Sequence, residues 1–284
     1  MYRAAAVFDF DGTLCSRRGL PPRNLAMLAD LKVRGVCRII ATGRSLDSFR
    51  QTADRLAPAG FPLDFLIFSS GAGMTDWQTG EIFPAGPLEA PEVRKIWDRL
   101  LGEGLDFMIH FPVPHNHRFY YLSQSPPGAN PDFERRLSVH WGQGEVLPEG
   151  EGFPASQFVV IYPPHRAGEV PGLSAGLEEF SLIRATSPLD GISLWMEIFP
   201  RGINKGSGLN RLLESLGLEE KPLLALGNDF NDLDLLAAAK KPLGTPCLVA
   251  DAPPELRGLF PQTLSCDEAG AAQAAEKWLR DNRL

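Results

Sequence analysis

Short apolar runs that end in polar residues dominate the first part of the chain. The runs Ala4–Phe8, Val36–Ala41 and Phe65–Phe68 have the length of buried strands. Between the first two, Asn24–Arg34 carries leucines at helical spacing, and Ser45 is placed to cap a second helix. Strand–turn–helix units of this length predict an α/β fold, a doubly wound parallel sheet with helices on both faces.

The pattern changes between about Trp77 and Pro200, where aromatic residues, prolines and glycines interrupt alternating segments. Such alternation predicts hairpin strands, here over Phe107–Phe111, Arg118–Leu122, Gln157–Tyr162, Ser181–Thr186 and Ser193–Phe199. Helices are expected around Glu92–Glu103 and Gly168–Glu179. We interpret this stretch as an α+β insert that forms its own small domain.

The α/β pattern resumes at Asn204. Leucines on one stripe predict a helix over Lys205–Leu216, and the further elements expected are Pro222–Leu226, Asn231–Ala239, Pro246–Ala250 and Glu268–Leu279. The sequence therefore predicts one core built from residues 1–78 and 200–284, with residues 79–199 inserted as a second domain.

Composition narrows the class of protein. The 284 residues carry 28 Lys+Arg and 35 Asp+Glu, a net charge of −7, with no block of basic residues, so binding to nucleic acid is not expected. No apolar run is long enough to span a membrane, so no transmembrane segment and no membrane partner are expected. The four scattered cysteines form no CxxC pair, which is typical of free thiols in a reducing compartment. A cytoplasmic protein is expected.

Two carboxylates follow the first predicted strand. Residues two apart in extended backbone point to the same side, so Asp9 and Asp11 converge at the carboxyl end of a parallel strand, where open α/β sheets bind ligands. Carboxylates so close together need a proton or a divalent cation between them, and hard oxygen ligands suit Mg²⁺. The alternative is a solvated Asp-rich turn in which Gly12 takes positive φ.

Polar groups also follow the other predicted strands. Thr42-Gly43-Arg44 offers a hydroxyl and backbone N–H groups at a helix N-terminus, which is an anion site. Lys205 begins a later helix, and Asn228 to Asp232 follow the fourth strand with oxygen ligands. Each has a simpler structural explanation alone, but together they predict one site at a common sheet edge.

The segments FDFDGT, TGR, INKG and GNDFND, in this order and at these strand ends, resemble the four motifs of haloacid dehalogenase-like (HAD) phosphatases. Gly71, the Glu197-Ile198 pair and the Lys205-Gly206 step resemble the Cof-type, subclass IIB branch. The resemblance implies a Rossmann-like core with a large α/β cap domain inserted before the Lys motif.

The resemblance also implies roles. Asp9 would be the nucleophile that forms an aspartyl-phosphate, and Asp11 the general acid and then the general base. Thr42 and the Gly43 N–H would bind phosphoryl oxygens, and Lys205 would offset negative charge. Mg²⁺ would be held by Asp9, the Asp11 carbonyl oxygen and the fourth motif. Further substrate contacts are expected from Arg44, Gly71 and Glu197.

The fourth motif departs from the family, which usually has Gly-Asp where this chain has Gly227-Asn228. Either Asn228 binds the metal and Asp232 supplies charge, or a shift brings in Asp229. We favour Asn228 as ligand, with Asp232 in the outer shell or bridging to Lys205. Weaker binding of Mg²⁺ is the expected consequence.

Three histidines of the insert, His110, His115 and His117, invite a metal-site interpretation. A loop whose histidines face solvent or the substrate is favoured instead. Arg44 has an alternative too, as a surface salt-bridge partner.

The sequence as a whole predicts a Mg²⁺-dependent phosphomonoesterase that acts on a small phosphate ester, and a sugar phosphate is the specific substrate class expected. Two alternatives remain at this stage: a phosphosugar-binding protein without turnover, suggested by Asn228, and a receiver-like signalling module that takes phosphate on Asp.

Overall fold

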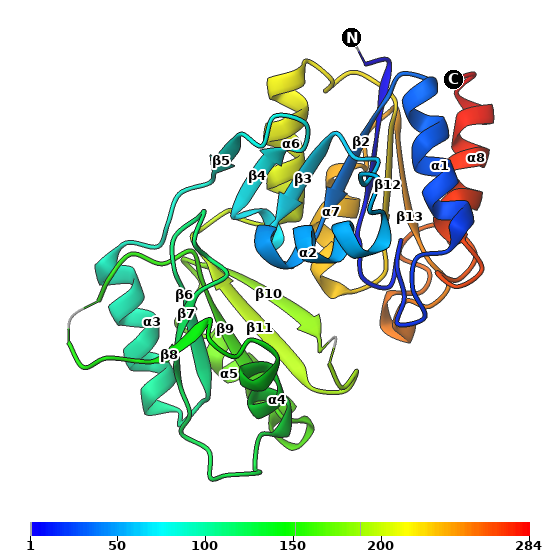
Figure 1. Cartoon of the computed structure of the whole chain (residues 1–284). Coiled ribbons are helices and arrows are strands. Elements are labelled where there is room, and N and C mark those ends of the chain that lie inside the picture. Colours follow the sequence, from blue (N-terminus) through cyan, green and yellow to red (C-terminus); the bar gives the residue numbers. More distant parts are fainter. Residues whose placement is uncertain (1, 151, 188) are drawn as a thin grey trace. The chain divides into compact units, whose positions relative to one another are not determined.

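The computed structural model describes residues 2–150, 152–187 and 189–284, and the chain divides into two units (Figure 1). The core unit comprises Met1–Phe83 and Asn204–Leu284, and the insert unit comprises Pro84–Ile203. These divisions lie a few residues after the boundaries predicted at 78/79 and 199/200. Two separate segments of sequence thus build the core unit.

A seven-stranded sheet forms the middle of the core unit. Its order is β13 (Gly244–Leu248), β12 (Leu223–Gly227), β1 (Ala4–Phe8), β2 (Val36–Ala41), β3 (Phe65–Phe68), β4 (Gly73–Asp76) and β5 (Ile82–Pro84). The first five strands run parallel, and β4 is antiparallel to β3. Every residue of β1, β2, β3 and β12 is buried, because helices cover both faces of the sheet.

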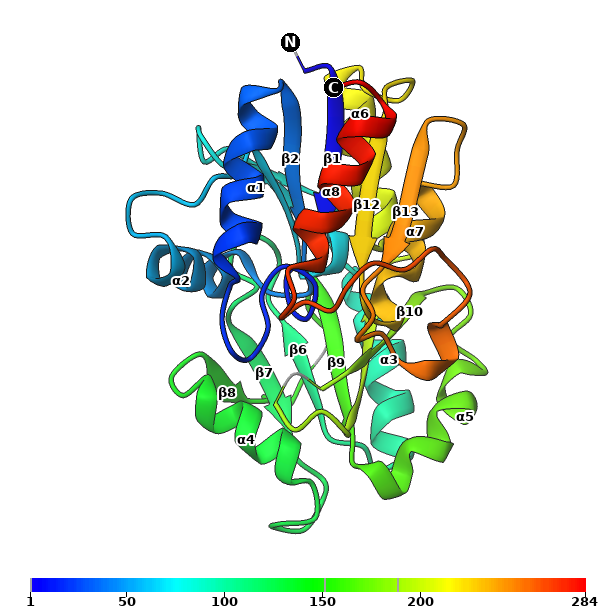
Figure 2. The same cartoon turned by 90° about the vertical axis from the view of Figure 1, so that its right-hand side faces the viewer.

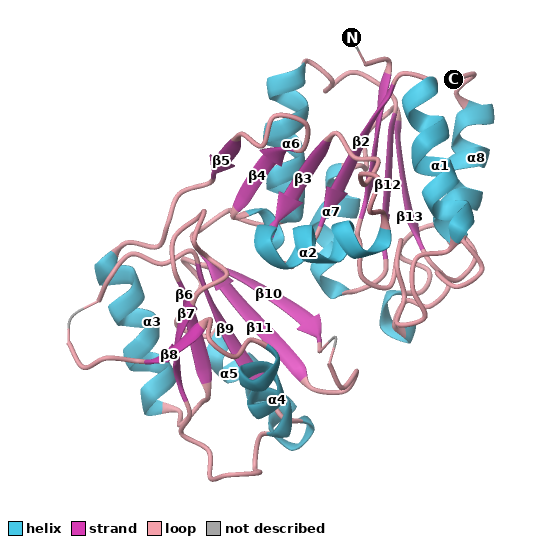
Figure 3. Ribbon diagram, viewed as in Figure 1, coloured by secondary structure: helices cyan, strands magenta, loops and turns pink. Residues whose placement is uncertain are grey.

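Helices lie on the two faces of this sheet (Figures 2 and 3). The core helices are α1 (Pro22–Val33), α2 (Leu46–Leu56), α6 (Lys205–Leu216), α7 (Leu233–Ala238) and α8 (Gly270–Asp281). Helices α1 and α8 pack together on one face, and α6 and α7 on the other, where their leucines join the core cluster. The predicted doubly wound α/β core is confirmed.

A six-stranded, mostly antiparallel sheet forms the insert unit. Its order is β10 (Ser181–Thr186), β11 (Leu194–Phe199), β9 (Gln157–Tyr162), β6 (Phe107–His110), β7 (Phe119–Leu122) and β8 (Gly144–Val146). Helices α3 (Ala90–Gly102) and α5 (Val170–Ser174) contribute to the apolar cluster on one side, and α4 (Pro131–Val139) to the other. The α+β character expected of the insert is confirmed.

The structure departs from the predicted insert unit at one expected helix and at one helix that was not expected. The helix expected over Gly168–Glu179 is a 3-10 turn, Pro164–Glu169, followed by the single short helix α5. It ends early because Gly176 has φ +99°, outside the helical region. Helix α4 was not predicted, although the Asn130 side chain caps it by accepting a hydrogen bond from the Phe133 N–H.

Candidate active site

The carboxyl ends of β1, β2 and β12 bring the predicted catalytic groups of the core unit to one sheet edge. Strand β1 pairs with β12 on one side and with β2 on the other. Asp9 follows β1 directly, Thr42 follows β2, and Asn228 follows β12. Asp9 is only 4% exposed, which excludes a solvated turn at this position.

Lys205 connects two carboxylates at this edge. Its Nζ donates to Asp9 Oδ1 and to Asp232 Oδ1, each at 2.6 Å, and its side chain is fully buried. Lys205 is the first residue of α6, and Asn204 caps that helix by accepting from the Ser207 N–H at 2.7 Å. A buried ammonium is tolerated only with such partners, so the helix start fixes the lysine between the two acids.

Burial strongly perturbs the ionisation of this cluster. It raises the pKa of the Asp9 carboxyl to about 8, Asp232 adds to the rise, and the Lys205 ammonium opposes it. Burial acts to lower the pKa of Lys205, but the carboxylates of Asp232 and Asp9 raise it above its usual value. A further positive charge beside Asp9 would therefore favour its carboxylate form at neutral pH.

The Asn228 amide lies close to the second carboxylate oxygen of Asp9 and to the Asp11 carbonyl oxygen. One terminal atom of the Asn228 amide lies 2.9 Å from the Asp11 carbonyl oxygen and 3.1 Å from Asp9 Oδ2. If this atom is the amide oxygen, it faces two other acceptor oxygens, those of Asp11 and Asp9. If it is the amide nitrogen, it donates a hydrogen bond to each of them. Gly12 permits this approach, since at φ +84° its added Cβ would lie 2.5 Å from the Asn228 side chain.

This oxygen set fits the magnesium ion that the fold family implies. With the Asn228 amide oxygen turned inward, the site offers three hard donors, Asp9 Oδ2, the Asp11 carbonyl oxygen and that amide oxygen, which are the kind Mg²⁺ takes alongside waters. The described residues contain no cluster of three or more His, Cys, Asp or Glu side chains suited to a metal. The fit consequently depends on a backbone carbonyl and an amide as well as on Asp9.

The other acids of the fourth motif have different partners. Asp232 Oδ2 accepts from the N–H groups of Asn228 at 2.8 Å and Asp229 at 3.1 Å. Asp229 accepts from the Phe230 N–H at 2.8 Å, at the start of a 3-10 turn. The choice of Asn228 over Asp229 as metal ligand stays a prediction.

The Arg44 guanidinium forms a bidentate ion pair with the Asp11 carboxylate. Its Nε and Nη2 donate to Asp11 Oδ2 and Oδ1, both at 2.7 Å. Its backbone N–H donates to Thr42 Oγ1 at 3.1 Å, and Thr42 is buried. Sequence reasoning missed Thr52, whose hydroxyl accepts from Arg44 Nη1 at 2.9 Å. Thr52 is buried on α2, nearly two turns after the helix start, and no motif in the sequence marks it.

Gly71 has a packing role that the sequence did not reveal. At φ +103°, an added Cβ would lie 2.3 Å from the Asn204 carbonyl oxygen, so only glycine lets the chain pass this close to the start of α6. The Gly71 carbonyl accepts from Arg211 Nη2 at 3.0 Å.

The remaining predicted residues lie in the insert unit. Glu197 is buried on β11, opposite Val159 of β9. His110 is buried on β6, with its Nδ1 2.8 Å from the Asn116 carbonyl oxygen, whereas His115 is exposed in the following loop. The rings of His115 and His117 are 6.5 Å apart in that loop, so the loop interpretation fits these two residues but not His110.

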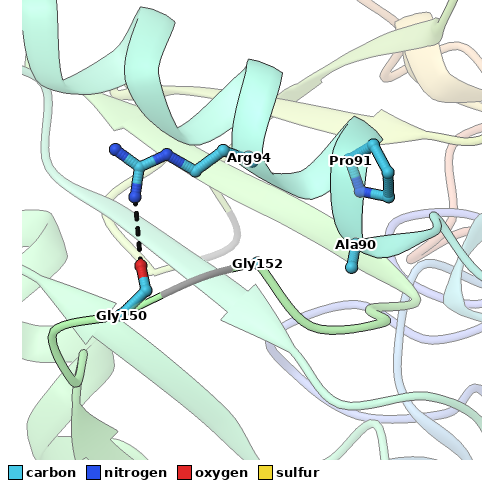
Figure 4. A pocket seen from close by; sticks show the side chains of 5 residues that line it. All are labelled: Ala90, Pro91, Arg94, Gly150 and Gly152. Atoms are coloured by element: carbon cyan, nitrogen blue, oxygen red, sulfur yellow. Dashed lines mark hydrogen bonds between the residues drawn. The ribbon is translucent and has the colours of Figure 1, made fainter.

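The insert unit also contains a pocket of about 390 Å³ at the first turn of α3 (Figure 4). Figure 4 shows Arg94 Nη1 donating to the Gly150 carbonyl at 3.1 Å beside Ala90 and Pro91. None of the predicted site residues is among the described residues that line this pocket. The described residues that line it all belong to the insert unit.

Comparisons with known proteins agree with the sequence motifs. The model of a family described as haloacid dehalogenase-like hydrolase matches residues 6–152 and 178–269. The HMP-PP phosphatase of Serratia proteamaculans (strain 568) is 28% identical over 299 residues, covering 100% of this chain and 98% of that protein.

Solved structures show the same fold. BT1666 from Bacteroides thetaiotaomicron, a phosphatase of the HAD superfamily, has a TM-score of 0.74 at 18% identity and covers 98% of this chain and 95% of its own. The HAD subclass IIB sugar phosphatase BT4131 has a TM-score of 0.72 at 18% identity, covering 96% and 98%. Within the described ranges, no helix combines the length and apolarity that crossing a bilayer requires.

Proposed function

Since the chain belongs to the haloacid dehalogenase-like hydrolases and is a phosphatase of the Cof type, we propose that it is a Mg²⁺-dependent phosphomonoesterase working through an aspartyl-phosphate on Asp9. The observation that carries this proposal is the buried Asp9–Lys205–Asp232 cluster beside the Asp11 carbonyl oxygen and the Asn228 amide.

In the first step, the Asp9 carboxylate attacks phosphorus in line while the bond from phosphorus to the leaving oxygen breaks. Asp11 gives its proton to that oxygen, so the alcohol leaves neutral. Thr42 Oγ1 and the Gly43 N–H bind the phosphoryl oxygens. Lys205 stays protonated and offsets charge on the nucleophile and the phosphoryl group.

In the second step, Asp11, now a carboxylate, takes a proton from a water that attacks the aspartyl-phosphate. The bond between phosphorus and the Asp9 oxygen breaks, which releases inorganic phosphate and restores both acids. Mg²⁺, held by Asp9, the Asp11 carbonyl and Asn228, would supply positive charge that favours the Asp9 carboxylate and offsets charge on the phosphoryl group.

The proposed substrate is a small phosphate ester, and a sugar phosphate remains our specific choice. The similarity of fold to a sugar phosphatase supports it, whereas the relatives named HMP-PP phosphatase offer a different substrate. Both kinds of relative are named phosphatases, which supports turnover over the binding-protein and receiver-like alternatives. We propose that the insert unit, residues 84–203, selects the substrate.

The test measures release of inorganic phosphate from p-nitrophenyl phosphate, a panel of sugar phosphates and HMP-PP, with Mg²⁺ and with EDTA. Release that requires Mg²⁺, and is faster from one sugar phosphate than from p-nitrophenyl phosphate, is expected. Fastest release from HMP-PP would overturn the sugar-phosphate assignment alone. Undiminished release in EDTA would overturn the metal dependence.

A further inference from the structure

The Asp11 carboxylate is held in one orientation by the Arg44 guanidinium. Two parallel N–H···O bonds of 2.7 Å join Arg44 Nε and Nη2 to the two carboxylate oxygens. This fork-to-fork geometry fixes the plane of the carboxylate as well as its position. The Asp11 side chain is 40% exposed, so the surrounding protein alone does not hold it.

Arg44 is itself anchored on other sides. Its Nη1 donates to Thr52 Oγ1 at 2.9 Å, and the Thr52 hydroxyl donates to the Ser48 carbonyl at 3.0 Å within α2. The guanidinium carbon lies 5.5 Å from the centre of the Phe10 ring, a cation–π contact. Helix α2 and the loop after β1 thus set the position of the fork that holds Asp11.

We propose that Arg44, set in place by Thr52, is a positioning residue that orients Asp11 for proton transfer to the leaving alcohol. This inference rests on the proposed function. It differs from the substrate contact expected of Arg44, since both donors of the fork are occupied by Asp11. Each carboxylate oxygen keeps a further lone pair for the proton that Asp11 transfers.

The choice of leaving group separates positioning from other roles. p-Nitrophenolate is weakly basic and leaves with little help from an acid, whereas a sugar alkoxide is strongly basic and needs the proton. The quantity to measure is kcat/KM, because it covers the steps up to release of the alcohol. A misplaced Asp11 lowers kcat/KM for the sugar ester and largely spares the aryl ester.

The experiment compares wild type with Arg44→Lys on glucose 6-phosphate and p-nitrophenyl phosphate. Lysine keeps the positive charge and loses the fork. We expect kcat/KM for glucose 6-phosphate to fall about a hundredfold, and that for p-nitrophenyl phosphate by less than about fivefold. An equal fall on both esters would mean that Arg44 binds the phosphoryl group or supports the fold, and would overturn the proposal.

Thr52→Val tests the anchor without touching the acid. It keeps the shape of the buried side chain and removes the acceptor for Arg44 Nη1, so the same selective loss is expected at about three- to tenfold. Arg50→Lys, on the exposed side of α2, is the matched control and should change neither ester. A Thr52→Val protein with unchanged kcat/KM on glucose 6-phosphate would contradict the anchoring role.

A double-mutant cycle then asks whether Arg44 acts through Asp11. In an Asp11→Asn background, Arg44→Lys should lower kcat/KM for glucose 6-phosphate no further. A full additional loss would overturn the proposal, while the proposed function would stand. Absence of phosphate release from both esters in wild type would instead count against the proposed function and, with it, against this inference.

Discussion

Buried carboxylates have different partners in the two units. In the core unit, Asp9 and Asp232 share the Lys205 ammonium at a sheet edge. In the insert unit, Asp132 accepts from Trp195 Nε1 at 2.6 Å and from the Ser187 hydroxyl at 3.1 Å, and these donors are neutral.

The same contrast extends to Asp106 of the insert unit. Its carboxylate accepts from the N–H groups of Gln124 and Ser125 and from the Asn130 amide. Neutral donors of this kind hold a loop and the start of a helix in place. They bring no cationic side chain to the carboxylate. The difference teaches that burial of an acid does not identify a catalytic group, whereas an acid that shares an ammonium at a strand end is a candidate for chemistry.

The largest expected effect comes from Asp9→Asn, which removes the proposed nucleophile. Release of phosphate should fall by more than about 10⁴-fold, with the melting temperature in EDTA close to that of wild type. Asp132→Asn is the matched change in the insert unit and should keep turnover on p-nitrophenyl phosphate. Retention of most activity by the Asp9 variant would contradict the proposed mechanism, in which Asp9 is the nucleophile.

Asp132→Ala sharpens the other side of the contrast. It leaves Trp195 Nε1 and the Ser187 hydroxyl without their acceptor, and should lower the free energy of unfolding by about 2–3 kcal/mol, measured by urea denaturation. Turnover per folded molecule on p-nitrophenyl phosphate should not change. Glu134→Ala, exposed in the same first turn of α4, controls for loss of a helix-terminal charge. A tenfold fall in turnover by folded Asp132→Ala would remove the distinction between the units.

Asn228→Asp adds a negative charge to the oxygen set of the core unit. Affinity for Mg²⁺ should rise about tenfold, because the charge is close to the proposed ion. Isothermal titration with Mg²⁺ measures the affinity, and melting in EDTA should show a less stable protein, since the carboxylate would face Asp9 and the Asp11 carbonyl. Unchanged affinity would be evidence against Asn228 as a ligand. Asp229→Asn is the control and should leave the affinity for Mg²⁺ unchanged.

The smallest effect concerns pH and the insert unit. Burial lowers the pKa of His110 to about 3, with Arg136 adding to the fall, so His110 is neutral in the folded chain. The unfolded chain takes up this proton near pH 6.5, so the stability it contributes is present above pH 6.5 and is lost as pH falls towards 3.

Between pH 7.5 and 5.5 this loss should be about 1 kcal/mol, measured by urea denaturation at each pH. His110→Asn keeps a donor for the Asn116 carbonyl and should reduce the pH dependence by that amount. An equal pH dependence in both proteins would show that His110 does not titrate as proposed. His115→Asn, exposed nearby, should behave as wild type.

The sequence predicted the five parallel strands of the core because their apolar runs are unambiguous, but it did not predict β4 and β5. The runs at Ala4–Phe8 and Val36–Ala41 are fully buried and end where polar residues begin, so their bounds match the structure residue for residue. In the insert unit, helix α4 was not predicted because the segment around Arg135 is mostly charged and few of its residues, such as Phe133, are buried. Periodicity is weak where only a narrow stripe is apolar.

At the site, order along the chain predicted which residues meet but not which atoms face one another. Asp9 and Lys205 are 196 positions apart, and their motifs alone placed them together. The Arg44 guanidinium bonds to both Asp11 and Thr52, and no spacing rule contains that information. The orientation of the Asn228 side chain likewise depends on Gly12, because a Cβ at that position would collide with it.

The divided core also imposes an order of events during synthesis. Strand β1 is made first, yet Ala5 pairs with Leu223 of β12, so one side of the central strand stays unpaired until the insert has left the ribosome. Lys205 and Asp232 reach Asp9 later still. We therefore expect a nascent chain from which residues up to about 203 have emerged to hold a folded insert and an open half-sheet, and the ability to form an aspartyl-phosphate to be acquired last.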